Sequence, residues 1–176
     1  MNYPRSEKYM TADLMAKIMG PNPIKLEEEL LIDHQIPKDA TVCDLGSGQG
    51  LTSVFLVKEY GFKVIAADLW SDPEENRKFF RKMGLTDEQI FPVKADAEAL
   101  PFEKEFFDAV VSTDSYNYFG RDPDYLDQKL LPFIKNGGYN PVLILLEFRT
   151  VDLARKLVDN DPTKGGYFIE PLYIEQ

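Results

Sequence analysis

A glycine-rich loop is the first feature of the sequence that could do chemistry. Residues 41–45 (TVCDL) form a short apolar run, and glycines follow at Gly46, Gly48 and Gly50. Glycine adopts left-handed backbone conformations without strain and lets a ligand approach the main chain closely, which suits a turn from a strand into a helix. The loop alone predicts either a ligand-binding turn or a bare turn without a ligand.

Acidic residues stand at the ends of three successive predicted strands. Asp44 precedes the first glycine, where a carboxylate repels a phosphate group but suits a ligand that carries an ammonium and a sulfonium group. Asp68 lies 22 residues after Gly46, where an acid can accept hydrogen bonds from two ribose hydroxyls. Asp96 could accept a hydrogen bond from an exocyclic amine such as that of adenine. Aspartate is also common as a cap at strand ends, so the prediction of a nucleoside site depends on all three together.

The elements that must position these residues alternate between strand and helix. Apolar runs predict strands at 41–45, 63–69, 90–95, 107–112, 142–148 and 167–174. Apolar periodicity and capping signals predict helices at 11–20, 22–37, 51–60, 72–84, 122–137 and 150–160. Continuous apolar strands between helices indicate an α/β fold with a doubly wound, mostly parallel sheet, which binds ligands beyond the carboxyl ends of its strands. We expect the N-terminal helices (1–36) to belong to the same domain as residues 37–176.

The composition narrows the range of partners. The 176 residues include 20 Lys+Arg and 30 Asp+Glu, and the net charge of −10 disfavours nucleic acid and an anionic membrane surface. Cys43 is the only cysteine and His34 the only histidine, so we expect no disulfide and no metal site. Because no apolar run reaches transmembrane length and the first residues lack a signal peptide, we expect a cytoplasmic protein.

These residues resemble class I S-adenosylmethionine-dependent methyltransferases, which have a Rossmann-like fold. The similar segments are 44–50 (their motif I), 68–70 (their acidic second motif), 96–102, 106–112 and 135–138. The resemblance spans roughly residues 38–148. Residues 3–6 and 114–120 are also similar to a bacterial subgroup of small-molecule methyltransferases.

The resemblance implies S-adenosylmethionine as the cofactor and a small-molecule methyl acceptor. The cofactor-binding residues that it implies are Asp44, Gly46, Ser47, Gly48 and Gly50 in the loop at the methionine end, Asp68 at the ribose, Leu69 or Trp70 on the adenine, Asp96 and the Ala97 amide at the adenine edge, and Ser112 and Thr113 at the methionine side and the acceptor. For Trp70, a place in the protein core is the alternative.

Methyl transfer needs little from the protein beyond positioning, because a sulfonium is already a good leaving group. A general base matters only for an acceptor that arrives protonated. The candidates are Asp114, Tyr116 and Tyr118, although a phenol with a reference pKa near 10 is a poor base. The two tyrosines could instead pack beneath the first helices. The acidic run 27–29 (EEE) is predicted to be a solvated helix face.

The carboxyl end departs from the family pattern. Members of the family have seven strands, whereas only 28 residues follow Phe148 here. We expect 167–174 to add to the edge of the shortened sheet and the protein to form a homodimer through that edge. Two alternatives stay open: a module that binds S-adenosylmethionine or S-adenosylhomocysteine without catalysis, and an NAD(P)-dependent oxidoreductase. The spacing G-x-G-x-G disfavours the second, whose fingerprint is G-x-G-x-x-G.

Overall fold

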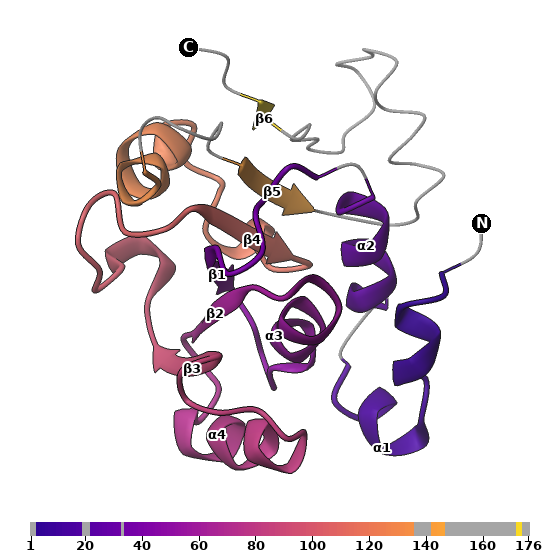
Figure 1. The fold of residues 1–176 in the computed structure, drawn as a ribbon. Coiled ribbons are helices and arrows are strands. Elements are labelled where there is room, and N and C mark those ends of the chain that lie inside the picture. The colour runs from indigo at the N-terminus through magenta and orange to yellow at the C-terminus, as the bar shows by residue number, and fades with distance from the viewer. Residues whose placement is uncertain (1–2, 19–21, 33, 136–141, 147–171, 174–176) are drawn as a thin grey trace.

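A six-stranded sheet forms the centre of the molecule (Figure 1). The computed structural model describes residues 3–18, 22–32, 34–135, 142–146 and 172–173. The strands are β1 (Thr41–Leu45), β2 (Lys63–Asp68), β3 (Ile90–Lys94), β4 (Ala109–Thr113), β5 (Val142–Leu146) and β6 (Leu172–Tyr173). Their order is β3-β2-β1-β4-β5-β6, and every neighbouring pair is parallel except β5 and β6. From β1 the chain first adds β2 and β3 on one side and then β4 and β5 on the other. The strand order therefore switches between β1 and β4, and the carboxyl ends of these two strands border the crevice where such sheets bind ligands.

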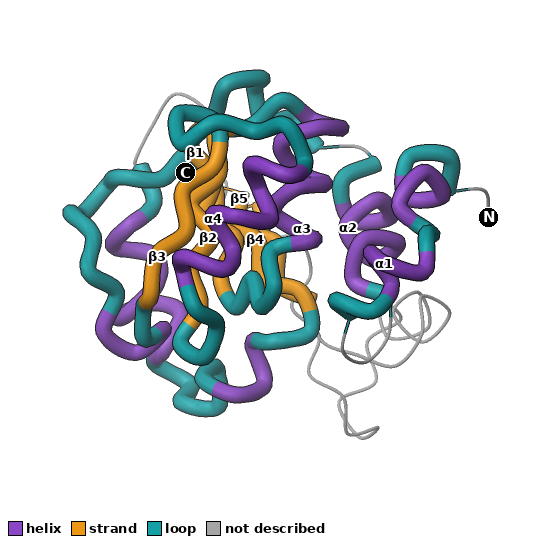
Figure 2. The backbone as a smooth tube through the Cα atoms, turned by 90° about the horizontal axis from the view of Figure 1, so that it is seen from below, coloured by secondary structure: helices purple, strands orange, loops and turns teal. Residues whose placement is uncertain are grey.

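Helical segments lie on both faces of the sheet (Figure 2). The α-helices are α1 (Ala12–Met15), α2 (Pro23–Leu30), α3 (Leu51–Phe55) and α4 (Pro73–Lys82). The 3-10 turns are η1 (Ser6–Tyr9), η3 (Ala97–Ala99), η4 (Tyr116–Tyr118) and η6 (Leu131–Phe133), and the π-helical turns are η2 (Leu56–Tyr60) and η5 (Leu126–Leu130). The predicted doubly wound, mostly parallel α/β fold is therefore confirmed.

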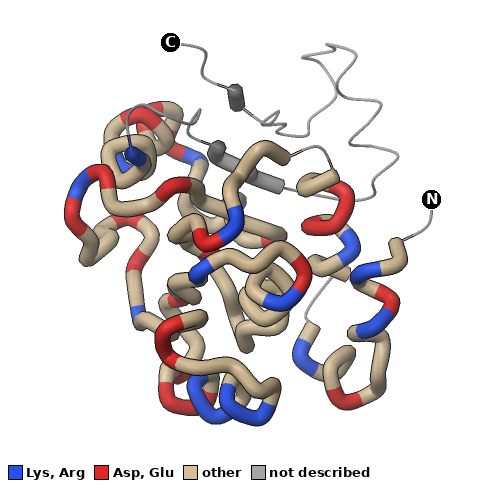
Figure 3. Tube along the Cα trace, in the orientation of Figure 1, with Lys and Arg blue, Asp and Glu red and all other residues tan. Residues whose placement is uncertain are grey.

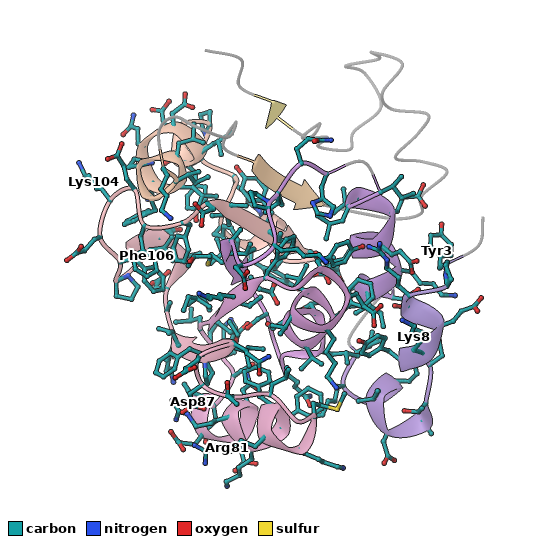
Figure 4. All side chains as sticks on the ribbon, in the orientation of Figure 1. Tyr3, Lys8, Arg81, Asp87, Lys104 and Phe106 are labelled. Carbon is teal, nitrogen blue, oxygen red and sulfur yellow. The ribbon has the colours of Figure 1, made fainter. Side chains whose placement is uncertain are left out.

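Side chains fill the layer on each side of the sheet (Figure 4), and alternate residues of β1 point into different layers. Val42 packs in one core with Ile24 and Phe55, whereas Cys43 packs in the other with Tyr125. This alternation explains why β1 is apolar without a break, since both of its faces are buried. Cys43 is fully buried, as a small core side chain.

Local sequence signals determine where helix α4 begins and ends. The Asp72 carboxylate accepts a hydrogen bond from the Glu74 N–H at 2.9 Å, and Pro73 occupies the first turn, where its missing N–H costs nothing. Acidic residues occupy the first turn and basic residues the last, and Figure 3 shows the two charges in red and blue. Both ends therefore stabilise the helix dipole.

Three predicted helices are shorter than expected. In the segment 22–37 only Pro23–Leu30 is α-helical. In the segment 11–20 only Ala12–Met15 is α-helical, and the side chain of Thr11 makes no capping hydrogen bond. In the segment 122–137 the chain forms a π turn and then a 3-10 turn that contains Pro132, whose backbone has no N–H to continue a helix. The predicted helix at 150–160 lies outside the described residues.

The sheet edge ends in a short antiparallel pair. Tyr173 lies opposite Val142 and Leu172 opposite Leu143, so these two residues of the segment 167–174 add to the edge as predicted. The other residues of that segment lie outside the described part of the chain, and the homodimer stays a prediction. In the described part of the chain, no helix combines the length and the apolarity that crossing a membrane requires.

Candidate functional site

The glycine loop turns sharply between β1 and α3. Gly46, Gly48 and Gly50 have φ angles of 82°, 52° and 79°, in the left-handed region that glycine favours. A Cβ atom at Gly46 would collide with the Ser115 hydroxyl, and one at Gly50 with the Phe80 ring. A Cβ atom at Gly48 would meet nothing within 4 Å. Packing therefore requires glycine at two of these positions, whereas the third borders open space that a ligand can enter.

Asp44 is a buried carboxylate at the start of this loop, with 1% of its surface exposed. Its Oδ2 atom accepts hydrogen bonds from Thr52 Oγ1 at 2.7 Å and Ser53 Oγ at 2.5 Å, both in α3. Burial raises the pKa of Asp44 to about 6; the two hydroxyl donors lower it, and the charge of Asp68 raises it further. The loop thus begins at an acid that is held in place from one side of the sheet.

Asp68 connects the end of β2 to the glycine loop. Its Oδ1 atom accepts from the backbone N–H groups of Trp70 at 2.8 Å and Ser71 at 2.7 Å, and its Oδ2 atom accepts from the Gly48 N–H at 2.9 Å. The side-chain amide of Asn76 donates to the Gly48 carbonyl at 2.9 Å. Sequence analysis missed Asn76, because nothing in its surroundings along the chain sets it apart from other polar residues of α4.

The residues predicted at the adenine lie near the ends of β2 and β3. Trp70 is 88% exposed and Leu69 is 39% exposed, so the alternative location of Trp70 in the core is wrong. Asp96 is exposed and caps η3 by accepting from the backbone N–H two residues later at 2.9 Å. Ala97 is buried, and its carbonyl accepts a hydrogen bond from the Tyr125 hydroxyl at 2.8 Å.

The end of β4 is tied to the glycine loop and to α2. Ser112 and Ser115 share a hydrogen bond of 2.7 Å between their hydroxyls, and Ser115 Oγ also donates to the Leu45 carbonyl at 2.9 Å. The Thr113 hydroxyl donates to Glu27 Oε1 at 3.3 Å. Ser112 is therefore linked through Ser115 to the residue before the loop, and Thr113 is linked to α2. Ser115 and Glu27 were not among the predicted residues.

The three candidate bases lie in different environments. Asp114 is partly buried, has a left-handed φ of 56°, and burial raises its pKa. Tyr116 is buried and packs edge-on against Tyr125, in the core on the face of the sheet opposite α2 and α3. Tyr118 is 80% exposed. The suggestion that these tyrosines pack beneath the first helices is therefore wrong.

The prediction of a solvated face for the acidic run in α2 is also wrong. Glu27 is 0% exposed and Glu28 is 7% exposed. Glu28 accepts hydrogen bonds from the backbone N–H groups of Arg5 at 3.0 Å and Ser6 at 2.7 Å. Both acids are thus buried by segments that come from elsewhere in the chain, a contact that the local pattern of charges does not reveal.

Strand register places the predicted residues at the carboxyl ends of neighbouring strands. Leu45 pairs with Ala67, so Gly46 and Asp68 follow at the same level. Asp44 pairs with Val111, so Ser112 follows beside Leu45. The glycine loop, Asp68 and the end of β4 therefore lie together, as one candidate site, at the carboxyl ends of β2, β1 and β4.

The residues present fit an adenosine cofactor with a cationic amino-acid end. The Ser47 hydroxyl is buried and has no hydrogen-bond partner among the described residues, which leaves a donor and an acceptor for a ligand. The Gly48 N–H, which a pyrophosphate would need, is already bound to a carboxylate. None of the residues assigned to the cofactor is basic, so the charge of the site favours a cation over a phosphate.

Comparison with known proteins gives a consistent result. Residues 42–138 match the family described as "Methyltransferase domain". Sarcosine/dimethylglycine N-methyltransferases of Halorhodospira halochloris and Aphanothece halophytica are each 33% identical, over 48% and 58% of this chain. The matched regions cover 30% and 36% of those proteins, so the chain spans about a third of the length of the curated relatives it matches.

A solved structure from Methanococcus maripaludis, described as a candidate S-adenosyl-L-methionine-dependent methyltransferase, superposes with a TM-score of 0.54 at 26% identity. The superposition covers 69% of this chain and 53% of that one. The family match covers more than half of the chain and contains the glycine loop, Asp68 and the end of β4. The chain therefore belongs to the methyltransferase domain family.

Proposed function

We propose that this chain transfers a methyl group from S-adenosylmethionine to a small-molecule acceptor. The hydrogen bond from the Gly48 N–H to the Asp68 carboxylate is the observation that carries the proposal. A dinucleotide cofactor would place its pyrophosphate against such an N–H, and the carboxylate would repel it. A cationic nucleoside gains from the same carboxylate, because its ribose can donate hydrogen bonds and its charge is opposite.

Each side of the site has a distinct role in this proposal. Asp68 binds a ribose hydroxyl through the one acceptor site that its three backbone donors leave open, since a carboxylate has about four such sites. Leu69 and Trp70 cover the adenine, and Asp96 with the Ala97 amide binds its edge. Ser47 and the backbone of the glycine loop hold the amino-acid end.

The protein contributes position more than chemistry. S-adenosylmethionine, when bound, supplies a methyl group on a positively charged sulfur, so that a lone pair of the acceptor forms the new bond while the carbon–sulfur bond breaks. In this proposal Thr113 and Ser112, at the end of β4, orient the acceptor. Holding two reactants in line can lower the barrier by roughly 7–11 kcal/mol.

Asp114 is the base that we assign where the acceptor must lose a proton. It follows β4 directly and its pKa is raised by burial, which makes its carboxylate more basic than an exposed one. Tyr116 is enclosed in the core and Tyr118 is exposed, so neither is placed as well.

An amine is the acceptor class to test first. Sarcosine and dimethylglycine appear in the names of the curated relatives, and both present a nitrogen for methylation. This chain matches only about a third of the length of those relatives, so the particular amine has to be identified by experiment.

Calorimetric titration of the full chain with S-adenosylhomocysteine, S-adenosylmethionine and NAD⁺ tests the proposal. We expect saturable binding of the first two and none of NAD⁺. Release of S-adenosylhomocysteine is then measured with sarcosine, dimethylglycine and ethanolamine. Binding without release from any amine would favour the module without catalysis, and preferential binding of NAD⁺ would overturn the proposal.

A further inference from the structure

Glu27 is a carboxylate on the core-facing side of α2. Ile24 lies three residues before it and Leu31 four residues after it, so the three side chains share one face of the helix. Their exposed fractions are 0% for Ile24, 0% for Glu27 and 1% for Leu31. This position is one that an amphipathic helix normally gives to an apolar residue.

One of the two carboxylate oxygens of Glu27 is left without a partner. Oε1 accepts a hydrogen bond from Thr113 at 3.3 Å, which is a long bond. Oε2 is buried and has no hydrogen-bond partner among the described residues, and within that same part of the chain Glu27 makes no ion pair. A buried acid with an open oxygen is costly to keep, so a function for it needs to be sought.

Glu27 faces the site and not a remote part of the core. Thr113 is the last residue of β4, and α2 contacts both β4 and α3. The pKa of Glu27 is raised well above its ordinary value, first by burial and then by the charge of Asp44. Asp44 of β1 is bonded to α3, and α2 packs against α3, so the two acids lie on the same face of the sheet near the start of the glycine loop.

The chemistry of this pair selects its ligand. Two carboxylates repel an anion. A metal ion needs more donors than they offer, since no group of three or more acidic, histidine or cysteine side chains in the described residues is arranged to hold one. An ammonium group fits both requirements, because it is a cation and its N–H bonds can satisfy Oε2.

We propose that Glu27 binds an ammonium group of a ligand at the end of β4. This inference rests on the proposed function, which supplies two sources of such a group: the amino-acid end of the cofactor and an amine acceptor. In either case Oε2 accepts a charge-assisted hydrogen bond, and Thr113 holds the other oxygen in place.

The test compares the wild type with Glu27→Gln and with Glu28→Gln in the full chain. Glutamine keeps the shape of the side chain and removes the charge. Glu28→Gln is the matched control, because Glu28 is a neighbouring buried acid of the same helix whose carboxylate accepts from the backbone N–H groups of Arg5 and Ser6, away from β4. Thermal unfolding confirms that each variant is folded.

The probes are S-adenosylhomocysteine, 5′-methylthioadenosine, which lacks the amino-acid end, and the amines sarcosine, dimethylglycine and ethanolamine.

The outcomes distinguish the two possible sources of the ammonium group, the cofactor and the acceptor. If Glu27 binds the cofactor, Glu27→Gln weakens S-adenosylhomocysteine at least about tenfold, the loss expected for a charged hydrogen bond, and leaves 5′-methylthioadenosine unchanged. If Glu27 binds the acceptor, both adenosine probes bind as before and an amine binds the cofactor complex about tenfold more weakly than in the wild type. Glu28→Gln changes none of these affinities.

Other results overturn the inference. Equal weakening of both adenosine probes would mean that Glu27 only supports the fold. Unchanged affinity for both, together with no amine that binds the wild type better than Glu27→Gln, would mean that Glu27 binds no ammonium group. A wild type that binds neither adenosine probe would instead refute the proposed function, and with it the basis of the inference.

Discussion

The Asp68 carboxylate binds the backbone N–H of Gly48 at 2.9 Å and thereby joins the end of β2 to the loop that follows β1. The same side chain accepts from the backbone of Trp70 and Ser71. One acid thus orders the glycine loop and the turn after β2 before any ligand arrives. A ligand that contacts both turns gains from this order, because less flexibility is lost on binding.

Replacing Asp68 by alanine should weaken cofactor binding. Asp68→Ala removes the ribose acceptor and leaves three backbone N–H groups without their partner, so we expect the affinity for S-adenosylhomocysteine to fall by about 1–3 kcal/mol in calorimetry. Asp72→Ala is the control, because Asp72 is an exposed acid that caps α4 in the same region of the chain. It should lower the unfolding temperature and keep the affinity. An unchanged affinity of Asp68→Ala would show that Asp68 does not hold the ribose.

Much of the fold was predictable because the signals are local. The cap, the proline and the charged ends of the segment 72–84 predict its helix, and the apolar runs of β1 and β4 reflect burial on both faces. The segment 122–137 was predicted less well, because Pro132 changes the hydrogen bonding while the apolar period remains that of a helix. Here the period describes which side chains are buried and not how the backbone is bonded.

The site was predictable only where its residues sit at strand ends. Asp44, Asp68 and Ser112 lie together because parallel strands bring their carboxyl ends to one edge. Glu27 was missed for the opposite reason: its partner Thr113 is 86 residues away in the sequence, and a run of three acids looks solvated without that contact. Burial of a helix face is a tertiary property that neighbouring residues do not encode.

Trp70 should report cofactor binding directly. It is the only tryptophan of the chain and is 88% exposed, so an adenine that covers it changes its fluorescence without a background from other indoles. We expect a saturable change on titration with S-adenosylhomocysteine and none with NAD⁺. Trp70→Ala should leave the unfolding temperature nearly unchanged and weaken the affinity by about 1 kcal/mol, the usual size of a stacking contact. A tryptophan signal that stays constant while calorimetry shows binding would place the adenine elsewhere.

The stability of the protein should depend on the ionisation of Asp44. Its pKa is about 6 in the folded protein and 3.8 for the ordinary group, so the folded state holds the proton more tightly than the unfolded state. Stability from this group is therefore fully present below pH 4 and is lost as the pH rises toward 6, by about 3 kcal/mol in all.

Asp44→Asn should remove this loss. Urea unfolding at pH 4, 5, 6 and 7 should give the wild type a steeper decline in unfolding free energy than the variant. Glu27 titrates in the same direction in both proteins, and the charge of Asp44 raises its pKa, so the difference between the two curves contains the loss at Asp44 together with this coupling. Asp72→Asn, a change at an exposed acid, should follow the wild type. Parallel curves for Asp44→Asn and the wild type would contradict the prediction.

Filling the open space beside Gly48 should weaken ligand binding beyond its effect on the stability of the fold. Gly48→Ala and Gly84→Ala form a matched pair, because both glycines have positive φ angles, 52° and 78°, and at neither would a Cβ atom meet anything within 4 Å. Each substitution should therefore destabilise the protein by a similar amount, about 1–2 kcal/mol, the cost of a left-handed alanine.

Only Gly48→Ala should weaken S-adenosylhomocysteine, since its Cβ atom enters the space that the ligand occupies, while Gly84 lies at the far end of α4. We expect a loss of at least about tenfold in calorimetry for Gly48→Ala and none for Gly84→Ala. Gly46→Ala should behave differently from both, because its Cβ atom collides with Ser115 and the loss appears first as a lower unfolding temperature. If Gly48→Ala and Gly84→Ala bind the probe equally well, the ligand does not occupy the space beside Gly48. The site must then be sought elsewhere along the carboxyl ends of the strands.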